Sequence, residues 1–477
     1  MAKKAAITAM QMDFPTNGAE REKLVPQITD HCGLSKRASI DWLRAFAASL
    51  NAPEKQLEVW KEIQTRANGD ALPPEILRGI SQVHMDVLAR ADEKEAAFEL
   101  AKEIVSMGVD GRQDIANVAD WILKRDLLDL FDRFYEASRD EFEADRSLLY
   151  RLAEAQVKNG DDDTAQETAK RAFEIEPDER CIATREWIWQ TFQARDSIHT
   201  TVANHLRDRG FFKWAEREYR QSMSLKMEPH FVYIKSHRWL SEMLHDQQDD
   251  ERAGEVLNML MDALDEKENA KIKKAFAIYD EPIGAVQARM NFFYAAHHRK
   301  QNDTEKEMQA LTKGVKASPY DADVLIAMHR VKDAPGEWRS DTREYIQKAD
   351  KHATAAIKKA RVEWERSNGQ PRSQRILAQK LNDYAWLVGN TIGDAQQAIR
   401  SSHESLELEP GTPGYLDTLG RCYYRVGDYE NAIRYQEQAV RRDPHSGQLL
   451  RQLDLFKSAM AQKNLAKEVG AKDGAKE

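Results

Sequence analysis

The sequence predicts an all-α protein, a superhelical solenoid of antiparallel helix pairs, on three observations. Apolar residues recur at the three- and four-residue spacing of amphipathic helices, and the other faces are polar, with 32% charged and 41% hydrophobic residues overall. One arrangement of small, large and turn residues returns several times along the chain. A chain of 477 residues is also too long for one ordinary compact core, whereas a repeat array grows in one dimension and does not need a single core.

The clearest copy of this arrangement lies at residues 413–446. Its marker residues are Leu416, Leu419, Gly420 and Tyr423 in a first helix, Gly427, Asp428 and Tyr429 in a turn, Ala432, Tyr435 and Ala439 in a second helix, and Pro444 at its end. Small residues at Gly420 and Ala432 allow the two helices to cross closely. Gly427 supplies the left-handed conformation that ends a helix, and Asp428 can cap the next one. These residues predict a helical hairpin.

This hairpin closely resembles the tetratricopeptide repeat (TPR), a helix-turn-helix unit of about 34 residues. A second strong copy spans residues 146–179, and its matching positions are Leu149, Leu152, Ala153, Gly160, Ala165, Ala172 and Pro177. A further copy precedes residue 410 and, together with the clearest one, predicts a C-terminal TPR pair at 374–446. This pair resembles the repeats that end some large bacterial TPR proteins, so the chain resembles a helical-repeat solenoid of bacterial type.

Weaker copies complete a central TPR array predicted at 146–330. Degenerate units are expected at 196–229, 234–267 and 288–321, where alanine, glycine or serine again occupies the helix-crossing positions. Residues 1–145 have helical periodicity with little of the TPR pattern, and irregular TPR-like helical hairpins are the expectation there.

The array is then interrupted. The remaining predicted segments are a loop and long basic helix at 331–373, a capping helix at 447–462 and a disordered tail at 463–477. The long helix is expected at 341–367, opened by a capping box between Asp341 and Glu344. Its lysines and arginines interleave with acidic residues, which favours a solvated face over a surface that docks RNA or an acidic protein.

Motifs that carry catalysis or nucleotide binding are absent from the sequence. There is no Walker loop, no GxGxxG after a strand, no HExxH and no GxSxG elbow. The adjacent residues His297 and His298 chelate poorly, because neighbours on a helix point about 100° apart. We therefore expect no cofactor, no metal and no enzymatic activity. The formal net charge of -9 argues against a nucleic-acid partner.

The cytoplasm is the expected location. Cys32, Cys181 and Cys422 form no CxxC pair and favour a reducing compartment. No run approaches the ~18 apolar residues that a membrane span needs, and the N-terminus is a poor signal peptide. Because the chain opens almost directly into helical sequence, a start upstream of Met1 with a missing N-terminal segment is the alternative.

The TPR resemblance implies a concave groove that binds an extended peptide or a partner's helix, lined by the first helix of each repeat. By repeat position, the groove residues are Asp417, Arg421, Tyr424 and Arg425 in the last repeat and Tyr150, Glu154 and Lys158 in the copy at 146–179. Arg421 and Arg425 are four residues apart, so they share one helix face and together can hold a carboxylate. The alternative is that both are ordinary solubilising residues. The chaperone-binding TPR clamp is not matched, because Gly414 and Thr418 occupy its Lys and Arg positions.

The leading functional hypothesis is a non-catalytic scaffold that binds a protein or peptide partner in this groove. The first alternative is an accessory region of a larger protein or complex, whose missing N-terminal domain or partner carries an enzymatic or signalling activity. The second is an enzyme with a pocket inside a helical toroid. The identity of the partner and the oligomeric state have no signature in the sequence.

Overall fold

The computed structural model describes residues 112–175, 194–224, 231–265, 270–278 and 282–473, and short stretches between 56 and 103. These residues form helices and turns and contain no β-strand, which confirms the predicted all-α class. The chain divides into two compact units, Met1–Glu176 and Pro177–Glu477. Most of the hairpins predicted before residue 112 lie outside the described residues.

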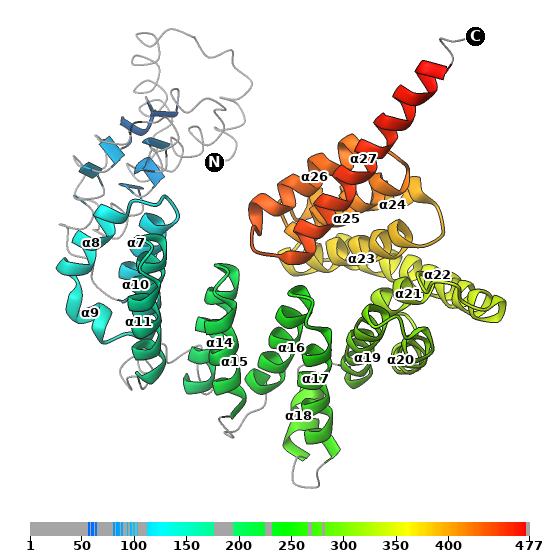
Figure 1. Ribbon diagram of the computed structural model, residues 1–477, viewed down its shortest axis with the longest axis horizontal. Helices are drawn as coiled ribbons and strands as arrows, with labels where there is room; N and C mark the ends of the chain where they lie inside the picture. The colour runs from blue at the N-terminus through cyan, green and yellow to red at the C-terminus, as the bar shows by residue number, and fades with distance from the viewer. Residues whose placement is uncertain are drawn as a thin grey trace. The chain divides into compact units, whose positions relative to one another are not determined.

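The first unit ends in the strong repeat predicted at 146–179 (Figure 1). Its helices are α7 (Arg112–Leu123), α8 (Leu128–Ala137), α9 (Arg139–Glu143), α10 (Arg146–Lys158) and α11 (Asp162–Glu174). Ala153 of α10 and Ala165 of α11 are fully buried, so the two helices cross at small residues as expected. Asp161 caps α11 by accepting a hydrogen bond from the Thr164 amide at 3.2 Å.

Buried arginines join the helices of the first unit. Arg151 of α10 forms two hydrogen bonds with the Asp120 carboxylate of α7, at 2.9 and 2.8 Å. Arg146 donates to the carbonyl oxygens of Ala172, Phe173 and Ile175, the last carbonyls of α11 and its cap. These carbonyls have no intrahelical partner, and a guanidinium at a helix C-terminus also interacts favourably with the helix dipole.

The second unit is a succession of helical hairpins (Figure 1). Its helices are α14 (Ala194–Asp208), α15 (Phe212–Ser224), α16 (Phe231–Asp246), α17 (Asp250–Asp265), α18 (Ala270–Ile278), α19 (Ile283–Lys300), α20 (Thr304–Ala317), α21 (Ala322–His329), α22 (Gly336–Arg366), α23 (Pro371–Asn390), α24 (Ala395–Leu408), α25 (Pro413–Arg425), α26 (Tyr429–Arg442) and α27 (Gly447–Asp473). The pairs α14–α15, α16–α17 and α19–α20 fall in the three degenerate units, whereas α18 and α21 have no counterpart in the prediction.

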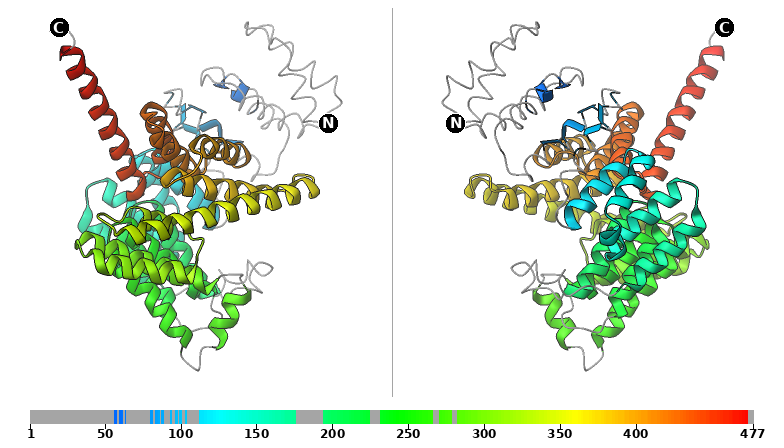
Figure 2. Two further views of the ribbon diagram at one scale, coloured as in Figure 1. Left: turned by 90° about the vertical axis from the view of Figure 1, so that its right-hand side faces the viewer. Right: turned by 90° about the vertical axis from the view of Figure 1, so that its left-hand side faces the viewer.

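Two predicted boundaries are wrong. The long helix α22 begins at Gly336, with Pro335 as its N-cap, so Asp341 lies inside the helix and cannot form the predicted capping box. The last helix α27 continues through the first part of the tail that was expected to be disordered and ends at Asp473. Residues 463–473 include three lysines, two alanines, one leucine and one glutamate, which have high helix propensity, and the end of α27 extends away from the other helices of its unit (Figure 2).

Close packing in the last repeat depends on Gly420 of α25. A Cβ atom at this position would lie 3.1 Å from the carbonyl oxygen of Ala432 and 3.3 Å from the ring of Phe456. Gly427 has a φ of 75° at the turn, and Asp428 caps α26 by accepting from the Asn431 amide at 3.2 Å. The small residue, the turn glycine and the cap therefore have the roles predicted from the sequence.

We expect the Gly420→Ala substitution to destabilise the last repeat by about 1 kcal/mol, the lower end of the cost of overpacking a core. The neighbours of the added methyl group must move by a few tenths of an ångström. Gly414→Ala in the same helix is the matched control, because a Cβ atom there meets nothing within 4 Å. Urea unfolding of both variants checks this expectation. Equal stability of the two variants would show that Gly420 is not needed for close packing.

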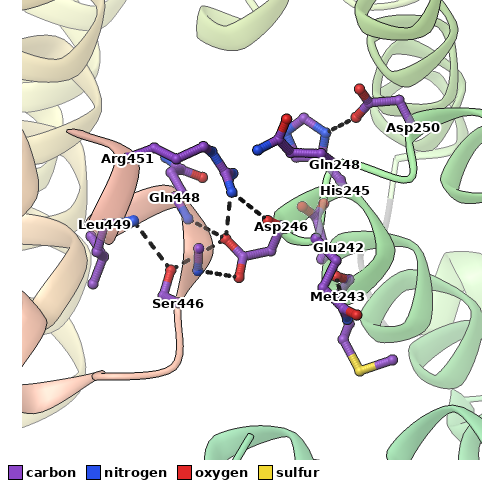
Figure 3. A network of polar contacts seen from close by, with 12 residues as sticks. Glu242, Met243, His245, Asp246, Gln248, Asp250, Ser446, Gln448, Leu449 and Arg451 are labelled. Carbon is purple, nitrogen blue, oxygen red and sulfur yellow. Dashed lines mark hydrogen bonds and ion pairs between the residues drawn. The ribbon is translucent and has the colours of Figure 1, made fainter. Parts of the chain in front are cut away.

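Polar contacts join the end of α16 to the beginning of α27 at the clasp, formed by Asp246, Ser446, Gly447, Gln448 and Arg451 (Figure 3). Asp246, the last residue of α16, accepts hydrogen bonds from the amides of Gly447 and Gln448 at 2.7 and 2.6 Å. The Ser446 hydroxyl donates to the same carboxylate at 3.3 Å, and Arg451 donates to the Asp246 carbonyl at 2.8 Å. A carboxylate from α16 therefore caps the first turn of α27.

Candidate functional site

Three arginines from two helical segments of the second unit gather around Asn390, the last residue of α23. This arginine cluster consists of Arg330, which follows α21, and Arg421 and Arg425 of α25. The Asn390 Oδ1 atom accepts a hydrogen bond from Arg421 Nε at 2.7 Å and a second one from Arg330. Its Nδ2 atom donates to the Trp386 carbonyl at 2.9 Å, which orients the amide oxygen toward both guanidinium groups.

Arg425 has a mainly architectural role in this cluster. It donates to the carbonyl oxygens of Val388 and Gly393, and the Gly393 bond is 3.0 Å long. These carbonyls belong to the end of α23 and the turn that follows, where helix carbonyls lack intrahelical partners. Arg425 therefore fixes the turn that carries Asn390, a role that neither predicted alternative had included.

Asp323 and Asp417 act electrostatically on Arg330 and Arg421 of the arginine cluster without pairing with them. Within the described parts of the chain, no carboxylate forms an ion pair with Arg330, Arg421 or Arg425. Desolvation by the surrounding helices, together with Arg421 and Arg299, lowers the pKa of Arg330 to about 10. Burial likewise lowers the pKa of Arg421. Both groups remain protonated at neutral pH, so the cluster is a local concentration of positive charge.

Arg289 of α19 shows how an arginine with carboxylate partners differs. Its guanidinium pairs with Glu242 of α16 and with Asp323 of α21, each at 2.5 Å. Asp323 also accepts a hydrogen bond from the Trp386 indole at 2.8 Å. This network ties α16, α19, α21 and α23 together and supports the helices on which Arg330 and Asn390 lie. Arg289 is thus engaged within the fold, whereas Arg330 and Arg421 share one neutral oxygen.

The two other predicted residues of the last repeat lie against the core. Tyr424 stacks on Phe456 of α27 with ring centroids 4.8 Å apart, and the Arg421 guanidinium lies 4.9 Å from the Tyr424 ring. Asp417 is only 4% exposed and accepts hydrogen bonds from Gln436 and Gln452, both at 2.7 Å. Burial raises the pKa of Asp417 to about 6. Tyr424 therefore positions Arg421, and Asp417 is part of the interior.

The three predicted groove residues of the first unit do not form a comparable cluster. Tyr150 and Glu154 are 1% and 4% exposed, so both side chains lie inside the unit. Lys158 forms an ion pair with Asp126, in the turn before α8. Of the seven predicted residues, Arg421 and Arg425 come together at the end of α23, where Arg421 binds Asn390 and Arg425 binds the carbonyl oxygen of Gly393.

Sequence reasoning missed Arg330 and Asn390. Arg330 stands at the end of a short apolar helix that matches no repeat position, and Asn390 ends a helix at a position where a polar residue is unremarkable. The two residues are 60 positions apart, and their contact arises from the packing of α21 against α23. The signal in the sequence that could have identified them was a polar residue at the end of each helix.

The fold defines this chain as a helical-repeat protein made of paired antiparallel helices. Family models named tetratricopeptide repeat match residues 413–446 and 147–179, the two segments with the strongest repeat pattern. The chain therefore contains tetratricopeptide repeats in these two segments.

Several solved structures resemble the chain at low sequence identity. A TPR protein from Parabacteroides merdae is 12% identical, with 65% of this chain and 98% of that chain covered and a TM-score of 0.31. TTC0263, a TPR protein from Thermus thermophilus, is 12% identical, with coverages of 56% and 99% and a TM-score of 0.26. Yeast Tom70 is 12% identical, with coverages of 94% and 98% and a TM-score of 0.25. No curated protein matches the chain.

Among the described residues, no helix combines the length and apolarity needed to cross a bilayer.

Proposed function

We propose that this chain is a non-catalytic TPR scaffold whose second unit binds an acidic segment of a protein partner at the arginine cluster. The convergence of Arg330 and Arg421 on the neutral Asn390 oxygen carries this proposal. Each guanidinium has five N–H donors, and these hydrogen bonds use only part of them. A carboxylate of the partner would form charge-assisted hydrogen bonds with the remaining donors and balance the charge of the cluster.

The contacts around the cluster favour a role of its arginines in ligand binding over a role as flexible side chains that are only solvated. Arg421 is held by Asn390 on one side and by the Tyr424 ring on the other, so its side chain is already ordered. An ordered side chain loses little conformational entropy when a ligand binds. An acidic partner is also favoured because the cluster is positive although the chain as a whole has a formal net charge of -9.

A peptide titration tests this proposal. The probe is a fluorescein-labelled hexaglutamate peptide, and its binding to the intact chain is measured by fluorescence anisotropy at several salt concentrations. We expect the Arg330→Gln/Arg421→Gln double variant to bind at least about tenfold more weakly, because charge-assisted hydrogen bonds are lost. Glutamine retains an N–H donor for Asn390, which preserves the local fold.

The matched control is the Arg366→Gln/Arg372→Gln variant, which removes two exposed positive charges from the end of α22 and the beginning of α23. It should bind hexaglutamate as the unchanged chain does, and hexalysine should bind to neither. If the control variant bound hexaglutamate as weakly as the Arg330→Gln/Arg421→Gln variant does, binding would depend only on the net charge of the chain. Unchanged binding in the Arg330/Arg421 variant would refute a role for the cluster.

A further inference from the structure

A small cavity lies where the segment after α21 meets the beginning of α22. Its volume is about 150 Å³. Polar or basic side chains from both segments line it, and these are His329, Arg339, Thr342 and Arg343. Apolar side chains, among them Met328 and Ile392, form the rest of its wall. A cavity of about this size accommodates a molecule as large as benzene, so it has room for a small polyatomic anion.

Thr342 of α22 lines this cavity and carries a hydroxyl group that the described part of the fold leaves without a partner. The residue is 2% exposed, and its Oγ1 atom has no hydrogen-bond partner among the described residues. Other threonines of this unit behave differently. Thr312 and Thr418, which lie in helices, and Thr391, directly after α23, each donate to the carbonyl four residues earlier, at 2.8, 2.9 and 2.6 Å. A buried hydroxyl group without a partner is uncommon, and a ligand in the cavity would supply the missing partner.

The charged side chains of the cavity are of one sign. Arg339 and Arg343 are four residues apart on α22, so they share one helix face. Acidic residues are close in sequence at Asp333, Glu337 and Asp341, but none of them forms an ion pair with either arginine in the described part of the chain. Both guanidinium groups therefore keep their donors available.

The arginine cluster adds to this positive potential. Arg330, Arg425 and Arg343 all act electrostatically on His329, whose pKa is lowered first by burial and then by these three charges. His329 therefore lies near arginines of the cluster and near Arg343 of α22. An anion in the cavity would experience attraction from both groups.

We propose that this cavity is a binding site for a phosphate group, with Arg339 and Arg343 as guanidinium donors and the Thr342 hydroxyl as a further hydrogen-bond partner. Guanidinium groups match the oxygens of phosphate geometrically and can bind two of them at once. The site uses residues other than Arg330 and Arg421, so it does not rest on the function proposed above. The phosphate group belongs either to a free anion or to a phosphorylated side chain of a protein, and the two sources share this chemistry.

Calorimetric titration of the intact chain with inorganic phosphate tests the site, with sodium chloride of equal ionic strength as the blank. We expect Arg343→Gln to weaken phosphate binding at least about tenfold through the loss of charge-assisted hydrogen bonds. Thr342→Val removes the hydroxyl at similar volume and should weaken binding several-fold while circular dichroism stays unchanged. Arg366→Gln, at the far end of the same helix, should bind phosphate normally.

A second titration distinguishes the sources of the phosphate group. It compares a short phosphoserine peptide with inorganic phosphate and with the same peptide carrying serine. Tighter binding of the phosphopeptide assigns the site to phosphorylated proteins, and equal binding of peptide-borne and inorganic phosphate assigns it to free anions. The proposal would be overturned if phosphate released no more heat than the chloride blank. It would also be overturned if Arg343→Gln and Thr342→Val both bound phosphate as the unchanged chain does. Loss of phosphate binding in the Arg330→Gln/Arg421→Gln variant alone would also overturn it.

Discussion

Replacing Asp246 by alanine is expected to destabilise the second unit by about 2 to 4 kcal/mol, since it removes a helix cap and charge-assisted hydrogen bonds together. The amides of Gly447 and Gln448 would lose their acceptor, and Ser446 would lose its contact with the carboxylate. Amide hydrogen exchange should accelerate in the first turn of α27 and in the last turn of α16. Urea unfolding of the intact chain measures the loss of stability.

Two further variants make this expectation specific. Asp246→Asn keeps an oxygen acceptor but loses the charge, so its loss of stability should be intermediate. Asp262→Ala removes an exposed carboxylate of α17 whose partner is Asn258 of the same helix, and its effect should be within about 0.5 kcal/mol of zero. If amide hydrogen exchange in α27 were the same in Asp246→Ala as in the unchanged chain, the clasp would not hold α16 and α27 together.

The second large effect is a dependence of stability on pH at Asp417. Its pKa is about 6 in the folded chain and 3.8 as the ordinary value, because burial disfavours the charged carboxylate. The folded state therefore binds the proton of Asp417 more tightly. The contribution of this residue to the free energy of unfolding is highest below pH 4 and declines as the pH rises through 6. We expect Asp417→Asn to gain up to about 3 kcal/mol relative to the unchanged chain between pH 4 and pH 7.

Asparagine is a suitable replacement because Asp417 Oδ1 alone accepts from Gln436 and Gln452, and asparagine keeps that atom. Asp454→Asn makes the same replacement on the exposed face of α27 and is the matched control. Unfolding by urea at pH 4, 5, 6 and 7 supplies the comparison. If the difference in the free energy of unfolding between Asp417→Asn and the unchanged chain did not vary with pH, folding would not shift the pKa of Asp417.

Local residue patterns were sufficient to predict the helical hairpins. The roles of Gly420, Ala432 and Asp428 follow mainly from neighbours in the same repeat, fewer than twenty residues away, although Phe456 of α27 also lies against Gly420. The same kind of reasoning failed at α22 and α27, where good helix formers continue a helix beyond the expected signals. Helix ends depend on a balance of small propensities, which tertiary packing shifts easily.

The candidate site depends on contacts between distant residues, and sequence patterns identify only part of it. The spacing of Arg421 and Arg425 in the sequence predicts that they share one helix face. It does not predict that Arg425 binds the carbonyl oxygens of Val388 and Gly393. Asp417 looked like a surface residue because it is charged, and the packing of α26 and α27 buries it. Repeat position predicts the backbone location of a residue, whereas exposure depends on which helices pack beside it.

Hydrogen exchange of the intact chain with and without hexaglutamate tests most directly whether the arginine cluster is the binding site. The proposal predicts slower exchange in the segments that carry Arg330, Asn390 and Arg421, at the ends of α21 and α23 and in α25, with no change in α10. Protection restricted to other helices, or no protection at saturating peptide, would contradict it.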